Sequence, residues 1–226
     1  MPNKLENSII RKIYDYGLFL TLRDRPEGWT LADGSWSPFY INLRPLPSFP
    51  DLFADVSRAF CEMLRKEDID AKTKIVGIAT AGVPIASGVG LECGIPVLYT
   101  RKLPEEITKP SEISAYLEHH GQHSLVEGLL CENDKLYLFD DVVTSFASKE
   151  LAIEQVKYQA KVLGIKNVEI KGIYVVIDRS SKNAKIEIEK SGIKLRAITD
   201  IGTMLNVLKD KLSEEEIAQI KSKIDG

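Results

Sequence analysis

Apolar residues at the start of the chain recur with the three- and four-residue spacing of an amphipathic helix. The residues that follow this spacing are Ile9, Ile10, Ile13, Tyr14 and Leu18. Residues 52–64 also have helical spacing, whereas residues 30–44 alternate around Gly34 and Pro38 and predict a bent hairpin or short strands. We expect residues 1–65 to form an N-terminal helix and a small hood-like lobe.

From residue 74 onward, short apolar runs alternate with helical patterns. Strands are predicted at residues 75–79, 96–100, 136–139 and 172–177, and helices at residues 84–93 and from 148 to 164. Ser213 and Glu216 have the spacing of a capping box that opens a last helix. This alternation predicts an α/β core over residues 66–226, with a mostly parallel central sheet flanked by helices. We expect the two segments to form one compact domain.

Composition narrows the classes of function. The 226 residues are 44% hydrophobic, and the formal net charge of −3 gives no global basic field for nucleic acid. A phosphate site would therefore have to be a local feature. The chain has three cysteines, Cys61, Cys93 and Cys131, and none of them forms a C-x-x-C pair. An odd number with this spacing argues against a disulfide framework and suits a reducing compartment. The polar start and the absence of an apolar run of ~20 residues predict a cytoplasmic protein without a membrane segment.

The stretch from Leu136 to Ser148 carries the most chemical information. Four apolar residues precede Asp140 and Asp141, which emerge where ligands bind in open α/β sheets. The hydroxyl residues Thr144, Ser145 and Ser148 follow, at the start of a helix whose backbone amides suit a phosphate. Two carboxylates beside a phosphate site suit a ribose diol together with Mg²⁺. Taken alone, the two aspartates could instead cap a turn, and Ser148 could be an ordinary N-cap.

The whole 13-residue pattern resembles the phosphoribosyl-pyrophosphate signature of type I phosphoribosyltransferases. That signature is an apolar strand, two acids, two apolar residues and then a Thr-Thr-Gly-Gly-Ser turn. The chain departs from it at Phe146 and Ala147, where the family has glycines. Glycine permits close backbone approach and positive φ, so Phe146 is expected to narrow or reshape the phosphate cradle. The resemblance spans about residues 5–210.

Two further stretches resemble the orotate branch of this family. Residues 31–44 are similar to a segment that lies over the base, with Ser37 and Tyr40 as the matching positions and Ala32 in place of a lysine. Thr80, Ala81 and Gly82 are similar to a loop that binds pyrophosphate through backbone amides at a helix start.

The long polar segment after residue 100 resembles the family's mobile catalytic loop. Arg101, Lys102 and His120 follow the order of the catalytic residues, and Glu118 replaces a further lysine, for which Lys109 is an alternative. Residues 103–120 are longer than the usual loop, and segments of this length are usually lids or disordered. The histidines of this stretch could also belong to a solvated loop that binds metal only by chance.

Asp178 and Arg179 end the fourth strand, as in the orotate branch, where the arginine binds the base carboxylate. The resemblance therefore implies transfer of ribose 5-phosphate from 5-phosphoribosyl 1-pyrophosphate to orotate, in the synthesis of pyrimidines. It also implies Mg²⁺, indirect contact of the metal with Asp140 and Asp141 through ribose or water, and a homodimer. Two alternatives stay open: a phosphoribosyltransferase for another base, and a non-catalytic or regulatory protein of this fold.

Overall fold

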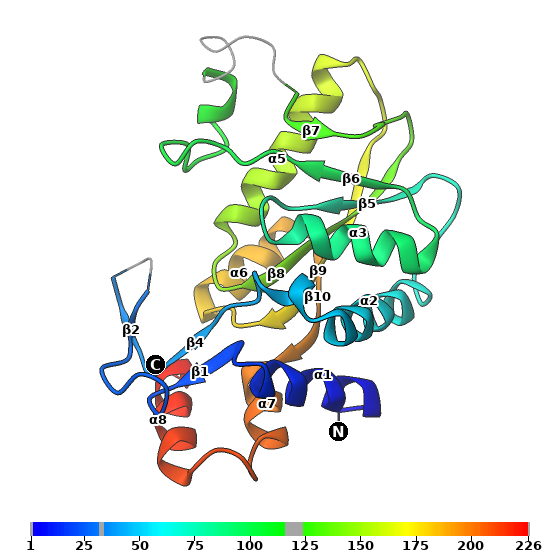
Figure 1. The fold of residues 1–226 in the computed structure, drawn as a ribbon. Helices are drawn as coiled ribbons and strands as arrows, with labels where there is room; N and C mark the ends of the chain where they lie inside the picture. The colour runs from blue at the N-terminus through cyan, green and yellow to red at the C-terminus, as the bar shows by residue number, and fades with distance from the viewer. Residues whose placement is uncertain (1, 32–33, 116–123, 226) are drawn as a thin grey trace.

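A six-stranded sheet forms the centre of the molecule, in the order β10-β9-β8-β5-β6-β7 (Figure 1). The computed structural model describes residues 2–31, 34–115 and 124–225. Only β7 runs antiparallel to its neighbour in this sheet. The strand bounds are β5 Thr73–Gly77, β6 Val97–Thr100, β7 Val126–Glu127, β8 Lys135–Val143, β9 Glu169–Asp178 and β10 Lys194–Asp200.

Helices cover both faces of the sheet, which confirms the predicted α/β class (Figure 1). On one face, Ile75, Phe139 and Val176 pack against α1, α2, α3 and α7, and on the other Val76, Leu138 and Val175 pack against α5 and α6. Consecutive strand residues thus point to opposite cores, as the pleat requires. The helix bounds are α1 Lys4–Asp15, α2 Pro50–Leu64, α3 Gly82–Cys93, α5 Ala147–Val162, α6 Lys182–Ser191, α7 Ile201–Val207 and α8 Glu214–Asp225.

The N-terminal lobe consists of two small antiparallel pairs beside this sheet. We call residues 19–41 the hood. β1 (Phe19–Thr21) pairs with β4 (Phe39–Ile41), and β2 (Trp29–Thr30) pairs with β3 (Trp36–Ser37). A 3-10 turn, η1 (Leu46–Ser48), leads into α2. The helices α1 and α2 share the apolar core of the sheet face, and the domain boundary near residue 65 stays a prediction.

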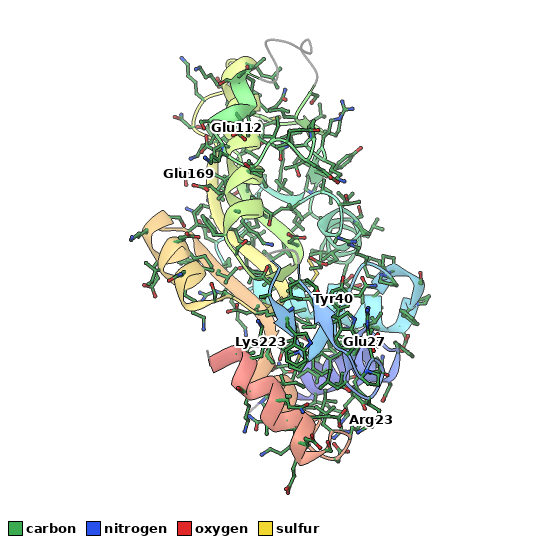
Figure 2. All side chains as sticks on the ribbon, turned by 90° about the vertical axis from the view of Figure 1, so that its left-hand side faces the viewer. Arg23, Glu27, Tyr40, Glu112, Glu169 and Lys223 are labelled. Carbon is green, nitrogen blue, oxygen red and sulfur yellow. A yellow bond between two sulfur atoms is a disulfide. The ribbon has the colours of Figure 1, made fainter. Side chains whose placement is uncertain are left out.

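The C-terminal helix holds the hood in place. The Thr21 hydroxyl donates to Glu216 Oε1 at 2.6 Å, Arg23 reaches Glu216 Oε2 at 2.6 Å, and Lys223 donates to the Ser35 hydroxyl at 3.2 Å. The predicted capping box opens this helix, because Ser213 N donates to Glu216 and Glu216 N donates to Ser213. Figure 2 shows Lys223 on α8 and Arg23 beside this helix, with Glu27 and Tyr40 in the neighbouring hood.

One prediction from the cysteines was wrong. Cys61 of α2 and Cys93 at the end of α3 form a disulfide with a Cα–Cα distance of 5.8 Å, whereas Cys131 is free and exposed. The spacing of the three cysteines gave no sign of this pairing, because it depends on how α2 packs against α3. No helix in the described part of the chain has the length and apolar character needed to cross a bilayer.

Candidate active site

Four of the predicted site segments meet at one edge of the sheet. They follow the carboxyl ends of the parallel strands β5, β6, β8 and β9, which lie side by side in the order β9-β8-β5-β6. The chain passes from β5 to β6 on one side and later adds β8 on the other side of β5. Such a reversal is a topological switch point, where open α/β sheets bind their ligands. In Figure 1 the hood and the segment after β6 both project on this side.

Asp140 and Asp141 directly precede the last two residues of β8, and they face opposite sides of the sheet. Asp140 is 7% exposed, and its Oδ1 accepts from Asp141 N at 2.9 Å while Oδ2 accepts from Lys149 Nζ at 2.8 Å. Asp141 Oδ1 accepts from Val142 N at 2.7 Å. Burial and then the charge of Asp140 raise the pKa of Asp141 to about 6. The two carboxylates therefore have different surroundings.

The turn after β8 presents hydroxyl groups and a free helix start. Thr144, Ser145 and Ser148 are exposed, and among the described residues no side chain caps the first turn of α5. Its backbone amides and partial positive charge are therefore available to an anion.

Phe146 does not occupy the phosphate cradle, so the expectation that it narrows the cradle was wrong. Its side chain is 6% exposed and packs in the core formed by Ile153 and Val156 of α5. Its φ of −82° lies in the ordinary helical region, and none of the described residues from 144 to 148 has positive φ. The side chain of Phe146 therefore belongs to the core, and a reshaped phosphate cradle stays a prediction.

The loop after β5 offers a second uncapped helix start. Thr80 is exposed, the Ala79–Thr80 peptide is cis, and within the described chain no side chain caps α3 at Ala81. A Cβ atom on Gly82 would lie 2.1 Å from Phe139 O, so only glycine permits this approach to β8. The starts of α3 and α5 thus flank the end of β8. Side chains cap α1, α6 and α7, whereas α2 also begins without a side-chain cap, with Pro50 as its first residue.

Arg179 joins the end of β9 to the hood. Its Nη2 donates to the buried Ser37 hydroxyl at 3.3 Å, and its guanidinium lies 4.3 Å from the centre of the Phe39 ring. Tyr40, the next residue of β4, stacks on Trp29 with ring centroids 6.1 Å apart. The structure therefore brings Ser37 and Arg179 together, while Tyr40 faces the other side of β4.

Both stems of the segment after β6 are tied to α5. Gln155 Nε2 donates to Arg101 O at 2.9 Å, and Gln159 Oε1 accepts from Leu125 N at 2.8 Å. A small apolar cluster adds to this anchor, through Ile107, Ile113 and Leu125 against Leu103, Leu151 and Tyr158. Figure 2 shows Glu112 near the top of the molecule and Tyr40 near its middle.

The charged groups of this loop lie on its surface. Arg101 and Lys102 are exposed and form long ion pairs with Glu127 (3.7 Å) and Glu105 (3.6 Å). His120, Glu118 and Ala32 lie outside the described residues. The alternative cation Lys109 is exposed, and its backbone N–H donates to Glu112 at 3.0 Å.

Comparisons with known proteins identify the family. The orotate phosphoribosyltransferase of Staphylothermus marinus is 30% identical over 189 residues, which cover 83% of this chain and 81% of the relative. That of Pyrococcus furiosus is 33% identical over 165 residues, or 73% of this chain and 79% of the relative. This chain belongs to the orotate phosphoribosyltransferase family. No family model matches the chain.

Solved structures agree on the fold of this orotate phosphoribosyltransferase family member. The UMP synthase of Leishmania donovani superposes with a TM-score of 0.77 at 22% identity, over 97% of this chain but only 42% of the synthase. The orotate phosphoribosyltransferase of Francisella tularensis gives a TM-score of 0.65 at 20% identity, over 96% of this chain and 98% of the other. These likenesses confirm the type I phosphoribosyltransferase fold.

The site of this family member is suited to a metal ion that arrives with its ligand. Within the described residues, no three His, Cys, Asp or Glu side chains cluster to hold a metal. Asp140 is already bound by Lys149, whereas Asp141 accepts from Val142 N through Oδ1 and is not paired with a lysine or arginine among the described ion pairs. Mg²⁺ in enzymes commonly uses one or two carboxylates together with substrate phosphates and water, so the residues fit such an ion.

Sequence reasoning missed three residues of this site: Lys149, Gln155 and Gln159. All three are buried polar residues on the inner face of α5. Their spacing from Phe146, Ile153 and Val156 places them on the apolar side of the helix, which is the signal that could have found them.

Proposed function

We propose that this protein transfers the ribose 5-phosphate group of 5-phosphoribosyl 1-pyrophosphate to orotate, giving orotidine 5′-phosphate and pyrophosphate in pyrimidine synthesis. The bond between ribose C1 and the pyrophosphate oxygen breaks, a bond between C1 and a ring nitrogen of orotate forms, and the proton of that nitrogen leaves to solvent. The observation that carries the proposal is the pair of uncapped helix starts, α3 and α5, on either side of Asp140 and Asp141. Two anion sites that flank two carboxylates suit a sugar with a phosphate at each end.

The ribose lies over the end of β8 in this proposal. The α5 start, with Thr144, Ser145 and Ser148, binds the 5-phosphate, and the α3 start at Thr80–Gly82 binds the pyrophosphate. Positive charge develops on the ribose ring as the C1–oxygen bond breaks. The fixed carboxylates of Asp140 and Asp141 hold the ribose hydroxyls, and the charge of Asp141 stabilises the positive ring without reorganisation.

The base lies between β9 and the hood. Arg179 offers a planar guanidinium that can bind a carboxylate with two hydrogen bonds, and its contacts with Ser37 and Phe39 fix its direction. Orotate carries such a carboxylate and neutral purines do not. Tyr40, stacked on Trp29, completes the hood beside this position.

The segment after β6 acts on the leaving pyrophosphate. Arg101 and Lys102 balance its negative charge, and His120 with the rest of the loop limits the access of water during reaction. Mg²⁺ would be held by the substrate oxygens and, through ribose or water, by Asp140 and Asp141, where it supplies charge neutralisation of the phosphates. We also propose a homodimer, on the resemblance to the family alone, and light scattering would test it.

The test follows the loss of orotate absorbance when the protein is mixed with orotate, 5-phosphoribosyl 1-pyrophosphate and Mg²⁺. Asp141→Asn is the control with strongly reduced activity. We expect turnover that requires all three components and is strongly reduced in the variant.

Other results would support the alternatives. No turnover, with 5-phosphoribosyl 1-pyrophosphate still bound in calorimetry, would indicate another base or a sensor. Absence of both turnover and binding would mean that the fold is retained without this chemistry.

A further inference from the structure

Lys149 is a buried cation that the proposed reaction does not use. It is the third residue of α5 and is 3% exposed. Its ammonium group donates to Asp140 Oδ2 at 2.8 Å, Val142 O at 2.7 Å and Ser148 Oγ at 3.2 Å. Three bonds use all the donors of an ammonium group. Lys149 therefore ties the end of β8 to the first turn of α5.

Packing alone does not favour a cation at this position. Phe146 precedes it by three residues and Ile153 follows it by four, and both side chains lie in the apolar core. Burial removes the ammonium group from water, and the start of a helix carries partial positive charge that repels a cation. An apolar side chain would suit the same space without these two costs, so the charge must have another use.

The charge has a use when an anionic substrate binds. Asp140 and Asp141 are adjacent, and the proposed 5-phosphate approaches the same turn. An unpaired Asp140 would repel that phosphate, whereas the Lys149 pair cancels its charge at 2.8 Å. Each Asp140 oxygen accepts one internal bond, from Asp141 N or from Lys149, and keeps a lone pair for a ribose hydroxyl.

We propose that Lys149 is a positioning residue for the ribose 5-phosphate part of the substrate. It fixes and neutralises the Asp140 carboxylate, and it stabilises the turn at residues 144–148, here called the phosphate turn, which lacks the usual glycines. This inference rests on the proposed function. It predicts a selective effect, because 5-phosphoribosyl 1-pyrophosphate and orotidine 5′-phosphate share this part of the molecule. Orotate and pyrophosphate lack it.

The test compares Lys149→Met and Lys149→Gln with the unaltered protein. The KM values of both substrates, orotate and the ribose donor, are measured in the forward direction, and those of orotidine 5′-phosphate and pyrophosphate in reverse. Calorimetry with Mg²⁺ gives the Kd of the two ribose 5-phosphate compounds without turnover. We expect the Kd of both compounds to rise at least about tenfold in Lys149→Met, with the KM of orotate and pyrophosphate within about threefold.

Lys74→Met is the matched control. Lys74 is also a buried ammonium on the same sheet and bonds Asp134 Oδ2 at 2.8 Å, but it lies at the amino end of β5. This variant should bind both ribose 5-phosphate compounds within about twofold of the unaltered protein. If Lys149→Met does not fold, Lys149→Gln decides the question, because its amide keeps hydrogen-bond donors for Asp140 and Val142.

Three results would overturn the inference. The first is a folded Lys149 variant that binds both ribose 5-phosphate compounds within about threefold of the unaltered protein. The second is an equal loss for all four ligands, and the third is no binding of 5-phosphoribosyl 1-pyrophosphate by the unaltered protein. If the unaltered protein binds this compound but does not turn over orotate, the proposed function fails, and the Kd comparison still decides the role of Lys149.

Discussion

Two buried lysine–aspartate pairs lie at opposite edges of the same sheet. At the amino edge, Lys74 Nζ is 2.8 Å from Asp134 Oδ2, and at the carboxyl edge Lys149 Nζ is 2.8 Å from Asp140 Oδ2. In a parallel sheet, the connecting helices end near the amino edge and start near the carboxyl edge. Lys74 therefore lies near the partially negative helix ends, which suit a cation, whereas Lys149 lies at a partially positive helix start.

The neighbours of each pair show the consequence of this difference. Lys74 also donates to Leu129 O, and Asp134 also accepts from Cys131 N at 2.6 Å, so this pair closes the loop before β8. The Asp140 pair instead lies beside Asp141 and the exposed hydroxyls of the phosphate turn. The same ionic contact stabilises a loop at one edge and prepares a ligand site at the other. What surrounds an ion pair thus decides what it contributes.

The largest expected effect on activity distinguishes Asp141, at the carboxyl edge, from Asp134, at the amino edge. Asp141→Asn should lower kcat by about 10²–10³-fold, because the amide cannot stabilise the charge that develops on ribose. Asp134→Asn, at the amino edge, should keep its kcat within about threefold wherever the protein remains folded, because it lies far from the ligand. Steady-state kinetics on both variants measure these changes, and equal decreases in kcat would contradict the difference between the two edges.

Lys74→Met sharpens the same comparison through stability. Removing one partner leaves Asp134, which is 1% exposed, as an unpaired buried charge. We expect the free energy of unfolding to fall by about 3–5 kcal/mol, as measured by urea denaturation. A loss below about 1 kcal/mol would show that the amino-edge pair does not hold the loop.

A third prediction concerns the base end of the carboxyl edge. Arg179→Leu should raise the KM of orotate by about 10–100-fold, because a charged hydrogen bond to the carboxylate is lost. The KM of the ribose donor should stay within about threefold, because that substrate does not reach Arg179. Arg25→Leu, an exposed arginine of the hood paired with Glu27, is the control. Equal changes in both KM values would place Arg179 outside the base site.

The last prediction concerns the change of stability with pH. The pKa of Asp141 is raised to about 6 in the folded chain, above its ordinary value near 4. The contribution of Asp141 to the free energy of unfolding is therefore fully present below about pH 4. This contribution is lost as pH rises through about 6. In the Asp141→Asn variant the amide does not ionise. The free energy of unfolding of the variant minus that of the unaltered protein should therefore be greater at pH 8 than at pH 4, by at most about 3 kcal/mol.

Urea denaturation of both proteins at the two pH values measures this difference. For the unaltered protein, kcat/KM should also fall about tenfold per pH unit below pH 6, since the ionised carboxylate is the active form. A stability difference between the variant and the unaltered protein that does not change from pH 4 to pH 8 would contradict the raised pKa.

Local patterns in the sequence determined the elements and their order at the site. The predicted helices at 52–64 and 84–93 correspond to α2 and α3, and the predicted strand at 136–139 lies within β8. Hydrophobic periodicity and capping residues act within a few positions, so they can be read from the chain directly. The sequence also placed Asp140 and Asp141 at a strand end. β10 and α6 were missed because exposed, charged residues interrupt their apolar pattern.

Only the tertiary structure decided which side chains meet. Ser37 and Arg179 are 142 positions apart, and Cys61 pairs with Cys93 across two packed helices. The sequence motif alone did not show that Phe146 packs into the core or that Lys149 bonds Asp140. It also did not show the hydrogen bond from Gln155 to Arg101 O, at the start of the loop. These contacts depend on how β8, α5 and the hood pack together, because packing selects the direction of each side chain after the elements have formed.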